Sequence, residues 1–280
     1  MKVRDTCQPP GGSTTPLLKW PGGKRNLVDA ILAEFPSEFG RYYEPFVGGG
    51  ATFFKLLPHR ATLSDANSQL INCYRIVRDQ PDDLIAALSG YVNSEAAYYR
   101  IRNYAPRNLV NQAARLLYLT RLSFNGIHRV NMQGKFNVPY GRRSYLETCD
   151  VAAIHTCSAA LRDVSLRNCD FGKAVASARC GDLIYLDPPY TVAHASNGFV
   201  RYNEKIFSWK DQVRLAGTAR RLAERGCTVI ISNANHASID QLYAGVEQRL
   251  LERFSVISAS SAHRKKVTES LFVMRGIPDR

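Results

Sequence analysis

In the stretch DLIYLDPPY, a carboxylate, two prolines and a tyrosine directly follow an apolar run. The run Leu183 to Leu186 is short and apolar, as in a buried strand, and proline cannot continue a sheet ladder. The residue before a proline is held extended. Asp187 is therefore expected to project from the carboxyl end of this strand, where open α/β sheets bind their ligands.

The tetrapeptide DPPY predicts a pocket of hydrogen-bond acceptors beside an aromatic ring. Pro188 and Pro189 have no N–H and offer only carbonyl oxygens. One N–H of a planar amino group can point to Asp187 and the other to the Pro188 carbonyl, while Tyr190 stacks on the ring. Adenine fits this description, and so do cytosine and a carboxamide. The candidate catalytic residues are Asp187, Pro188, Pro189 and Tyr190.

A second candidate site is the glycine turn of YYEPFVGGGATFFKLL, which predicts a strand, a turn at Gly48–Gly50 and a helix. Nucleotides bind at such turns, although a purely structural turn has the same glycines. Asp65 ends the next expected strand and could hydrogen-bond ribose hydroxyls. A nicotinamide dinucleotide would satisfy these two features, but it would leave DPPY unexplained.

Short apolar segments alternate with amphipathic ones, which predicts an α/β sheet. The expected strands are Tyr42–Val47, Ala61–Ser64, Val164–Asn168, Leu183–Leu186, Thr228–Ser232, Leu250–Ser258 and Leu271–Arg275. Between the second and third, four segments have the i, i+3, i+4 spacing of amphipathic helices: SQLINCYRIVRD, DDLIAALSGYV, EAAYYRIRNY and LVNQAARLLYLTRL. We interpret them as a helical insertion in the α/β fold.

The composition is that of a basic globular protein. At 280 residues and 45% hydrophobic content, the chain can form one large or two modest domains. Its net charge is +13, and residues 71–145 hold 11 basic and 4 acidic residues, a net of +7. This excess favours a polyanionic partner, and a solvated basic surface is the alternative. No apolar run has the length of a membrane span, and the N-terminus has no apolar core of a secretory signal.

The seven cysteines are odd in number and never in CxxC spacing. This pattern indicates reduced thiols in a cytosolic protein and gives no sign of a zinc site.

Eight stretches resemble, in the same order, those of the Dam-type S-adenosylmethionine-dependent DNA adenine-N6 methyltransferases of the alpha group. They are LLKWPGGKRNLVDAI, YYEPFVGGGATFF, LSDANSQLI, FNGIHRVNMQGKFNVPYG, NCDF, YLDPPY, VIISN and RKKVTESLF. The resemblance implies an α/β fold: a Rossmann-like methyltransferase sheet with an inserted, mainly helical target-recognition domain. The expected parts are a tail at 1–16, a catalytic domain at 17–70 and 146–280, and the DNA-recognition insertion at 71–145.

The same resemblance implies methyl transfer from S-adenosylmethionine to adenine N6 in duplex DNA, in the palindrome GATC, by base flipping. No metal is expected. The residues that it assigns to the cofactor are Trp20, Lys24, Pro45, Phe46, Gly48, Gly50, Asp65, Asp170, Phe171 and Asp187.

The residues that it assigns to DNA are Lys19, Phe124, Asn125, Ile127, Arg129, Pro139, Arg264, Lys265 and Lys266. Phe124 resembles an aromatic wedge that enters the base stack, and Arg129 an arginine that reads guanine. The alternatives are a core aromatic for Phe124 and a plain surface arginine for Arg129. The stretch HRKK, residues 263–266, is interpreted as a phosphate-contacting loop.

Three other functions stay open from the sequence: an RNA adenine-N6 methyltransferase, a DNA adenine methyltransferase with another recognition site, and a DNA-binding protein without catalysis. DPPY rather than NPPY favours DNA adenine over a glutamine side chain as the acceptor. We expect a monomer in the cytoplasm, associated with the nucleoid through DNA. The sequence leaves open whether the host setting is a restriction–modification system, a phage or a housekeeping genome.

Overall fold

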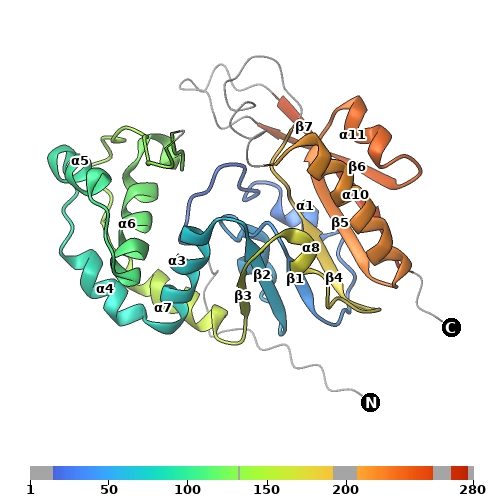
Figure 1. Ribbon diagram of the computed structural model, residues 1–280, viewed down its shortest axis with the longest axis horizontal. Coiled ribbons are helices and arrows are strands. Elements are labelled where there is room, and N and C mark those ends of the chain that lie inside the picture. Colours follow the sequence, from blue (N-terminus) through green and yellow to red (C-terminus); the bar gives the residue numbers. More distant parts are fainter. Residues whose placement is uncertain (1–14, 132, 192–206, 255–265, 277–280) are drawn as a thin grey trace. The chain divides into compact units, whose positions relative to one another are not determined.

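The computed structural model describes residues 15–131, 133–191, 207–254 and 266–276. Its strands form one seven-stranded sheet in the order β3-β2-β1-β4-β5-β7-β6 (Figure 1). The strands are β1 (Tyr42–Glu44), β2 (Ala61–Asp65), β3 (Ser165–Asn168), β4 (Leu183–Leu186), β5 (Thr228–Ala234), β6 (Glu247–Phe254) and β7 (Lys266–Met274). The first five follow the order 3-2-1-4-5 of doubly wound nucleotide-binding sheets.

Strand direction within the sheet is mixed. β1 pairs in parallel with β2 and β4, and β4 with β5, whereas β7 runs antiparallel to β5 and β6. Tyr42 of β1 lies opposite Leu183 of β4, so the carboxyl ends of these two strands meet at one edge, at the point where the strand order reverses. Ligands bind at such an edge in open α/β sheets.

The seven expected strands are all present, which confirms the prediction of an α/β sheet. The bounds differ most in the last two. β6 begins at Glu247 rather than Leu250, and its expected end, residues 255–258, lies outside the described ranges. β7 begins at Lys266 rather than Leu271, because its polar first half pairs with β6. Backbone pairing, which composition does not reveal, decides both bounds.

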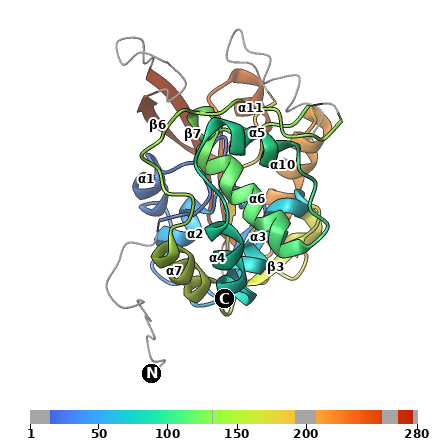
Figure 2. The ribbon, with the colours of Figure 1, turned by 90° about the vertical axis from the view of Figure 1, so that its left-hand side faces the viewer.

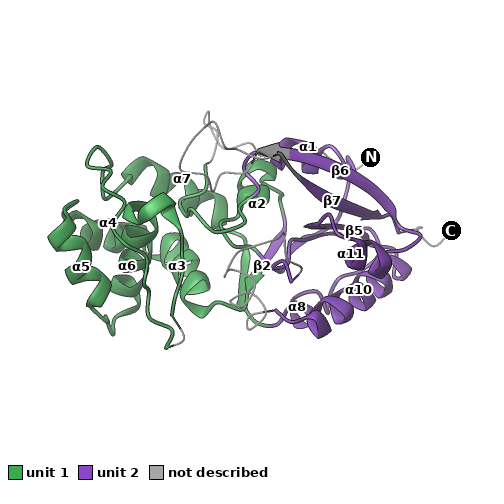
Figure 3. Ribbon diagram, turned by 90° about the horizontal axis from the view of Figure 1, so that it is seen from above, with its two compact units in different colours: residues 1–23, 47–59, 64–169 green, residues 24–46, 60–63, 170–280 purple. Residues whose placement is uncertain are grey.

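The chain divides into two compact units (Figure 3). Unit 1 comprises Met1–Gly23, Val47–His59 and Ser64–Cys169, and unit 2 comprises Lys24–Phe46, Arg60–Leu63 and Asp170–Arg280.

Unit 1 contains the helices of the expected insertion: α3 (Ser68–Asp79), α4 (Pro81–Ser89), α5 (Glu95–Asn103) and α6 (Leu109–Leu122), with α2 (Ala51–Leu56), the 3-10 turn η1 (Phe124–Gly126) and α7 (Val151–Leu161). α3, α4 and α5 each contact α6, and Figure 2 shows α4, α5 and α6 together. Asn67 and Asn108 cap α3 and α6 by accepting from backbone N–H groups. α3 runs without a break through the expected domain boundary at 70/71.

Unit 2 contains the short helices α1 (Val28–Leu32), α8 (Phe171–Ala174) and α11 (Ala237–Leu242), and the longer α10 (Trp209–Glu224). Ser208 and Asp211 form a capping box at the start of α10. The helix buries Leu215, Ala219 and Leu222 at helical spacing and contacts β5 and β7. This packing holds the start of α10 near the chain that follows β4.

In the described ranges, no helix has the length and apolar character needed to cross a membrane. The six cysteines in these ranges are free, and the ranges contain no cluster of three His, Cys, Asp or Glu side chains that could hold a metal ion.

Candidate active site

The DPPY carboxylate is held by a buried lysine. Nζ of Lys24 lies 3.1 Å from Oδ1 of Asp187 and 2.9 Å from Oε2 of Glu269, and it donates to the Tyr190 hydroxyl. The same Nζ lies 4.6 Å from the centre of the Tyr190 ring. The side chains of Lys24 and Glu269 are 4% and 1% exposed, whereas Asp187 is 20% exposed. Of the two carboxylates, Asp187 is therefore the one that a ligand can reach.

The charges of this cluster stabilise one another. Burial by itself lowers the pKa of Lys24, but the negative charges of Asp187 and Glu269 and the nearby Tyr190 outweigh it, so that this pKa is raised well above its usual value. Burial raises the pKa of Tyr190, which keeps the phenol protonated. An ammonium beside Asp187 favours the ionised carboxylate, which is an acceptor only.

Two amide side chains support the proline turn. Nε2 of Gln212, in α10, donates to the Pro189 carbonyl over 3.3 Å, and Nδ2 of Asn233 donates to Oε1 of Gln212 over 3.1 Å. Gln212 and Asn233 are fully buried. Asn233 belongs to the VIISN stretch, so this motif acts on the DPPY turn through one side chain of α10.

The glycine turn is held by Asp65 within unit 1. Oδ2 of Asp65 accepts from the Gly48 N–H over 3.2 Å, and Oδ1 accepts from Asn67 N–H over 2.9 Å. Burial raises the pKa of Asp65, and these backbone hydrogen bonds partly oppose the shift. Gly48 and Gly50 have positive φ values of 46° and 69°, which only glycine adopts without strain.

Trp20 packs on the same turn. A Cβ atom at Gly48 would lie 3.0 Å from Cδ1 of Trp20, so the absence of a side chain at Gly48 permits this approach. The sequence placed Trp20, Gly48, Gly50 and Asp65 at one site, and the structure brings all four together in unit 1.

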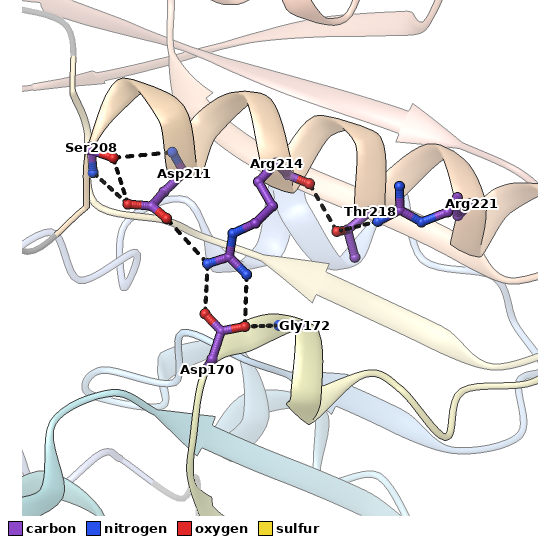
Figure 4. A network of polar contacts seen from close by, with 7 residues as sticks. All are labelled: Asp170, Gly172, Ser208, Asp211, Arg214, Thr218 and Arg221. Atoms are coloured by element: carbon purple, nitrogen blue, oxygen red, sulfur yellow. Dashed lines mark hydrogen bonds and ion pairs between the residues drawn. The ribbon is translucent and has the colours of Figure 1, made fainter.

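Asp170 and Phe171 of NCDF lie in unit 2 and both contact Arg214. Figure 4 shows the pair of Arg214 with Asp170. Arg214 of α10 donates to both oxygens of Asp170, over 2.8 and 2.7 Å, and its guanidinium lies 3.9 Å from the centre of the Phe171 ring. These hydrogen bonds lower the pKa of Asp170. Phe171 itself is only 4% exposed and packs near Phe46 and Phe207.

The loop after α6 carries the expected DNA-binding residues. Phe124 is 48% exposed, which argues against the alternative of a core aromatic. Asn125, next to it, has a φ of 54° and is exposed too. Ile127 is half-buried, and Pro139 is exposed and accepts from the Phe124 N–H over 2.9 Å.

Arg129 is exposed on a short hairpin, opposite Asn137. Nε of Arg129 donates to Oδ1 of Asn137 over 2.8 Å, and a bridge between Val130 and Phe136 closes the hairpin beside them. Lys19 lies against this loop, because a Cβ at Gly126 would lie 2.3 Å from its Cδ. Arg264 and Lys265 lie outside the described residues, as does the Lys266 side chain.

Six further residues contact the predicted site residues or lie beside them and were not predicted from the sequence: Glu269, Gln212, Asn233, Arg214, His128 and Asn137. One signal could have revealed Glu269. In a strand, alternate residues share a face, and Glu269 alternates with the apolar Leu271 and Val273, all three buried. A carboxylate on an apolar strand face requires a partner.

The strand order and the glycine turn are typical of nucleotide-binding α/β proteins, and similarity to known proteins identifies the family. The model of the D12 class N6 adenine-specific DNA methyltransferases matches residues 20–258. The chain is 37% identical over 271 residues to the type II methyltransferase M1.LlaDCHI of Lactococcus lactis subsp. cremoris, covering 93% of this chain and 95% of that protein. It is 33% identical over 262 residues to the DNA adenine methylase of Escherichia coli K12, and the match covers 91% of this chain and 93% of that protein. It is 31% identical over 283 residues to the type II methyltransferase M.MjaIII of Methanocaldococcus jannaschii, and the match covers 92% of this chain and 98% of that protein.

The chain belongs to the D12 class of N6 adenine-specific DNA methyltransferases. It is an adenine-specific DNA methyltransferase, and DNA is its macromolecular partner. The resemblance to Dam-type enzymes that the sequence motifs indicated is confirmed.

Proposed function

We propose that the protein transfers a methyl group from S-adenosylmethionine to N6 of the adenine in GATC, after flipping that base out of the duplex. The observation that carries the proposal is the Asp187 carboxylate directly after β4, paired with Lys24 and followed by a proline turn that Gln212 supports. The family gives the substrate class, and these acceptors explain how adenine is held.

The acceptors act on the electrons of N6. Adenine N6 is a weak nucleophile because its lone pair is delocalised into the ring. One N–H of the amino group donates to Asp187 and the other to the Pro188 carbonyl, which turns the lone pair out of the ring plane. S-adenosylmethionine supplies an electrophilic methyl group. Acceptors that are already in place stabilise the positive charge that develops on N6 without reorganising.

Asp65 fits the ribose of this cofactor. Its carboxylate accepts two backbone N–H groups, and a carboxylate has further lone-pair positions for hydroxyl donors. The cofactor contacts that we propose are Trp20, Pro45, Phe46, Gly48, Gly50, Asp65, Asp170, Phe171 and Asp187. We assign Lys24 to Asp187 rather than to the cofactor, because its buried ammonium donates to Tyr190 and forms ion pairs with Asp187 and Glu269.

The loop after α6 supplies the contacts to DNA. The exposed ring of Phe124 fits a wedge that fills the stack when the target adenine leaves it, which costs a few kcal/mol of unstacking. Arg129, exposed and held through Nε by Asn137, fits a guanine reader. Asn125, Ile127, Pro139 and Lys19 complete the proposed interface, with Arg264, Lys265 and Lys266 as phosphate contacts.

The recognition sequence GATC is proposed because FNGIHR and FNVPYG resemble the elements of enzymes that methylate this site. The relative from Escherichia coli is named a DNA adenine methylase, which agrees with the target base. A monomeric state and a cytoplasmic, nucleoid-associated location stay predictions.

Tritium transfer from labelled S-adenosylmethionine to short duplexes tests the proposal. The protein should label a GATC duplex, and labelling should fall on duplexes with any single-base change in that site. Replacing Asp187 by alanine should lower the single-turnover rate about 10²–10³-fold while DNA affinity survives. The exposed Asp163 is a matched control, and Asp163→Ala should keep the parental rate. Labelling of an RNA duplex instead of DNA, or a rate for Asp187→Ala within threefold of the parent, would contradict the proposal.

A further inference from the structure

Glu269 is a second carboxylate on the lysine that holds Asp187. It lies in β7, opposite Ala234 of β5, and its side chain is 1% exposed. Oε2 of Glu269 lies 2.9 Å from Nζ of Lys24, slightly closer than Oδ1 of Asp187 at 3.1 Å. Nothing in the proposed chemistry uses this buried acid directly.

Burying Glu269 has a free-energy cost that packing alone does not require. A buried carboxylate loses its hydration, and replacing a whole buried ion pair by apolar side chains is often neutral or stabilising. The strand positions that share its face, Leu271 and Val273, are apolar. An apolar residue would fit this face, so the carboxylate at position 269 points to a role for its charge.

The geometry gives that role. The Lys24 ammonium donates to the Tyr190 hydroxyl and forms ion pairs with the carboxylates of Asp187 and Glu269. Each of these three groups keeps the ammonium from moving toward the other two. Without Glu269, the ammonium would be drawn onto Asp187 and would occupy lone pairs that adenine N6 has to reach.

We infer that Glu269 is a positioning residue for methyl transfer, which acts through Lys24 to fix the ammonium and leave the outer face of the Asp187 carboxylate open to N6. The inference rests on the proposed role of Asp187. Glu269 touches neither base nor cofactor in this scheme, so its removal should affect the chemical step and spare binding.

The test uses Glu269→Gln, which keeps the shape and removes the charge, and Glu269→Asp, which keeps the charge on a shorter arm. The measurements are the single-turnover rate at saturating cofactor and DNA, the cofactor Kd by calorimetry and the DNA Kd by anisotropy. DNA from a host without adenine methylation serves as the substrate, so that the result does not depend on GATC. The exposed Glu224, at the end of α10, provides the control Glu224→Gln.

We expect Glu269→Gln to lower the rate by roughly 10- to 100-fold, less than loss of the direct contact, with both Kd values within about threefold of the parent. The single-turnover rate of Glu269→Asp should lie between those of the parent and Glu269→Gln. The rate of Glu224→Gln should equal that of the parent. In a Lys24→Met background, Glu269→Gln should change the rate less than about twofold, because residues that act as a unit are not additive.

Three results would overturn the inference: a parental rate for Glu269→Gln, a loss of cofactor affinity as large as the loss of rate, or a full additional loss in the Lys24→Met background. If Glu269→Gln alone does not fold, the double variant compared with Lys24→Met decides the same question, since it carries no unpaired buried Lys24 charge. A parent protein that labels no adenine in DNA would instead refute the proposed function itself.

Discussion

The rings of Trp20 and His128 stack, with centroids 4.4 Å apart and planes inclined by 19°. Trp20 also packs on the glycine turn at Gly48, and His128 directly precedes Arg129. Within unit 1, one aromatic pair therefore links the turn assigned to the cofactor with the loop assigned to DNA. His128 is buried, and the ring of Phe136 makes an edge contact with it, with centroids 5.6 Å apart.

His128 should make the protein less stable in mild acid. Burial, aided by the positive charge of Arg115, lowers the pKa of His128 from 6.5 to about 4. Between these values the unfolded chain binds more protons than the folded protein, so stability falls as the pH falls. From pH 7.5 to pH 5 the free energy of unfolding should drop by about 2 kcal/mol through this group. Urea unfolding of the parent and of His128→Phe at both pH values checks this, and an equal drop in the two proteins would contradict it.

Gly48→Ala should weaken both folding and cofactor binding. A residue other than glycine in the left-handed region costs about 1–2 kcal/mol, and the new Cβ would also press on Trp20. Gly134 is the control, because its φ is 74° but a Cβ there would meet nothing within 4 Å. Gly134→Ala should show the backbone strain alone, with unchanged affinity for S-adenosylmethionine in a calorimetric titration. Equal cofactor affinities for the two variants would remove Gly48 from the cofactor site.

Arg214→Gln should weaken cofactor binding. Arg214 holds both oxygens of Asp170, the residue proposed to meet the cofactor adenine, and hydrogen bonds to charged groups contribute about 1.5–3 kcal/mol. Because this pair is partly exposed, we expect the lower end, a rise of roughly tenfold in the Kd of S-adenosylmethionine. Arg221, on the same helix, donates only to Thr218 among the contacts drawn in Figure 4. Arg221→Gln should leave the Kd unchanged, and a parental Kd for Arg214→Gln would show that Asp170 needs no such support.

Arg129→Ala should relax the base preference at one position of GATC. An arginine that binds guanine through two hydrogen bonds favours it over other bases by about 1–3 kcal/mol. The variant should therefore methylate duplexes changed at that base pair at nearly the rate at which it methylates GATC. Asn137→Ala should act in the same direction more weakly, because it removes only the partner of Nε. Methylation rates on all single-base changes of GATC check this, with the exposed Arg142 as control. A proportional slowing of every duplex would make Arg129 a phosphate contact.

Phe124→Ala should slow methylation on every site alike. The Phe124 ring is 48% exposed, so the substitution should hardly affect the stability of the protein. It removes the ring that we propose as the wedge in the base stack. Fluorescence of 2-aminopurine at the target position reports flipping directly, and its rise should be slower in the variant. Tyr145→Ala, a change at a ring that is 78% exposed, is the control. A changed ranking of sites with unchanged flipping would make Phe124 a base reader instead.

Several helices and strands of this protein could be predicted from its sequence, because residues close together in the chain determine them. α3 and α6 have the bounds that their apolar spacing predicts, each begins after a capping asparagine, and Asp187 follows β4 as the proline rule requires. The presence of the seven strands was predictable for the same reason. The first residues of β6 and β7 were not predictable, because the backbone pairing between these two strands decides where each one begins.

Tertiary structure alone decided which charged and aromatic side chains meet. Lys24 reaches Glu269, Arg214 reaches Asp170 and Trp20 stacks on His128 across long stretches of chain. Periodicity describes a residue's own helix or strand, whereas these contacts depend on strand order, register and loop paths. Motifs therefore indicated the chemistry of Asp187, and only the folded chain showed that a buried lysine shared with a second carboxylate holds it.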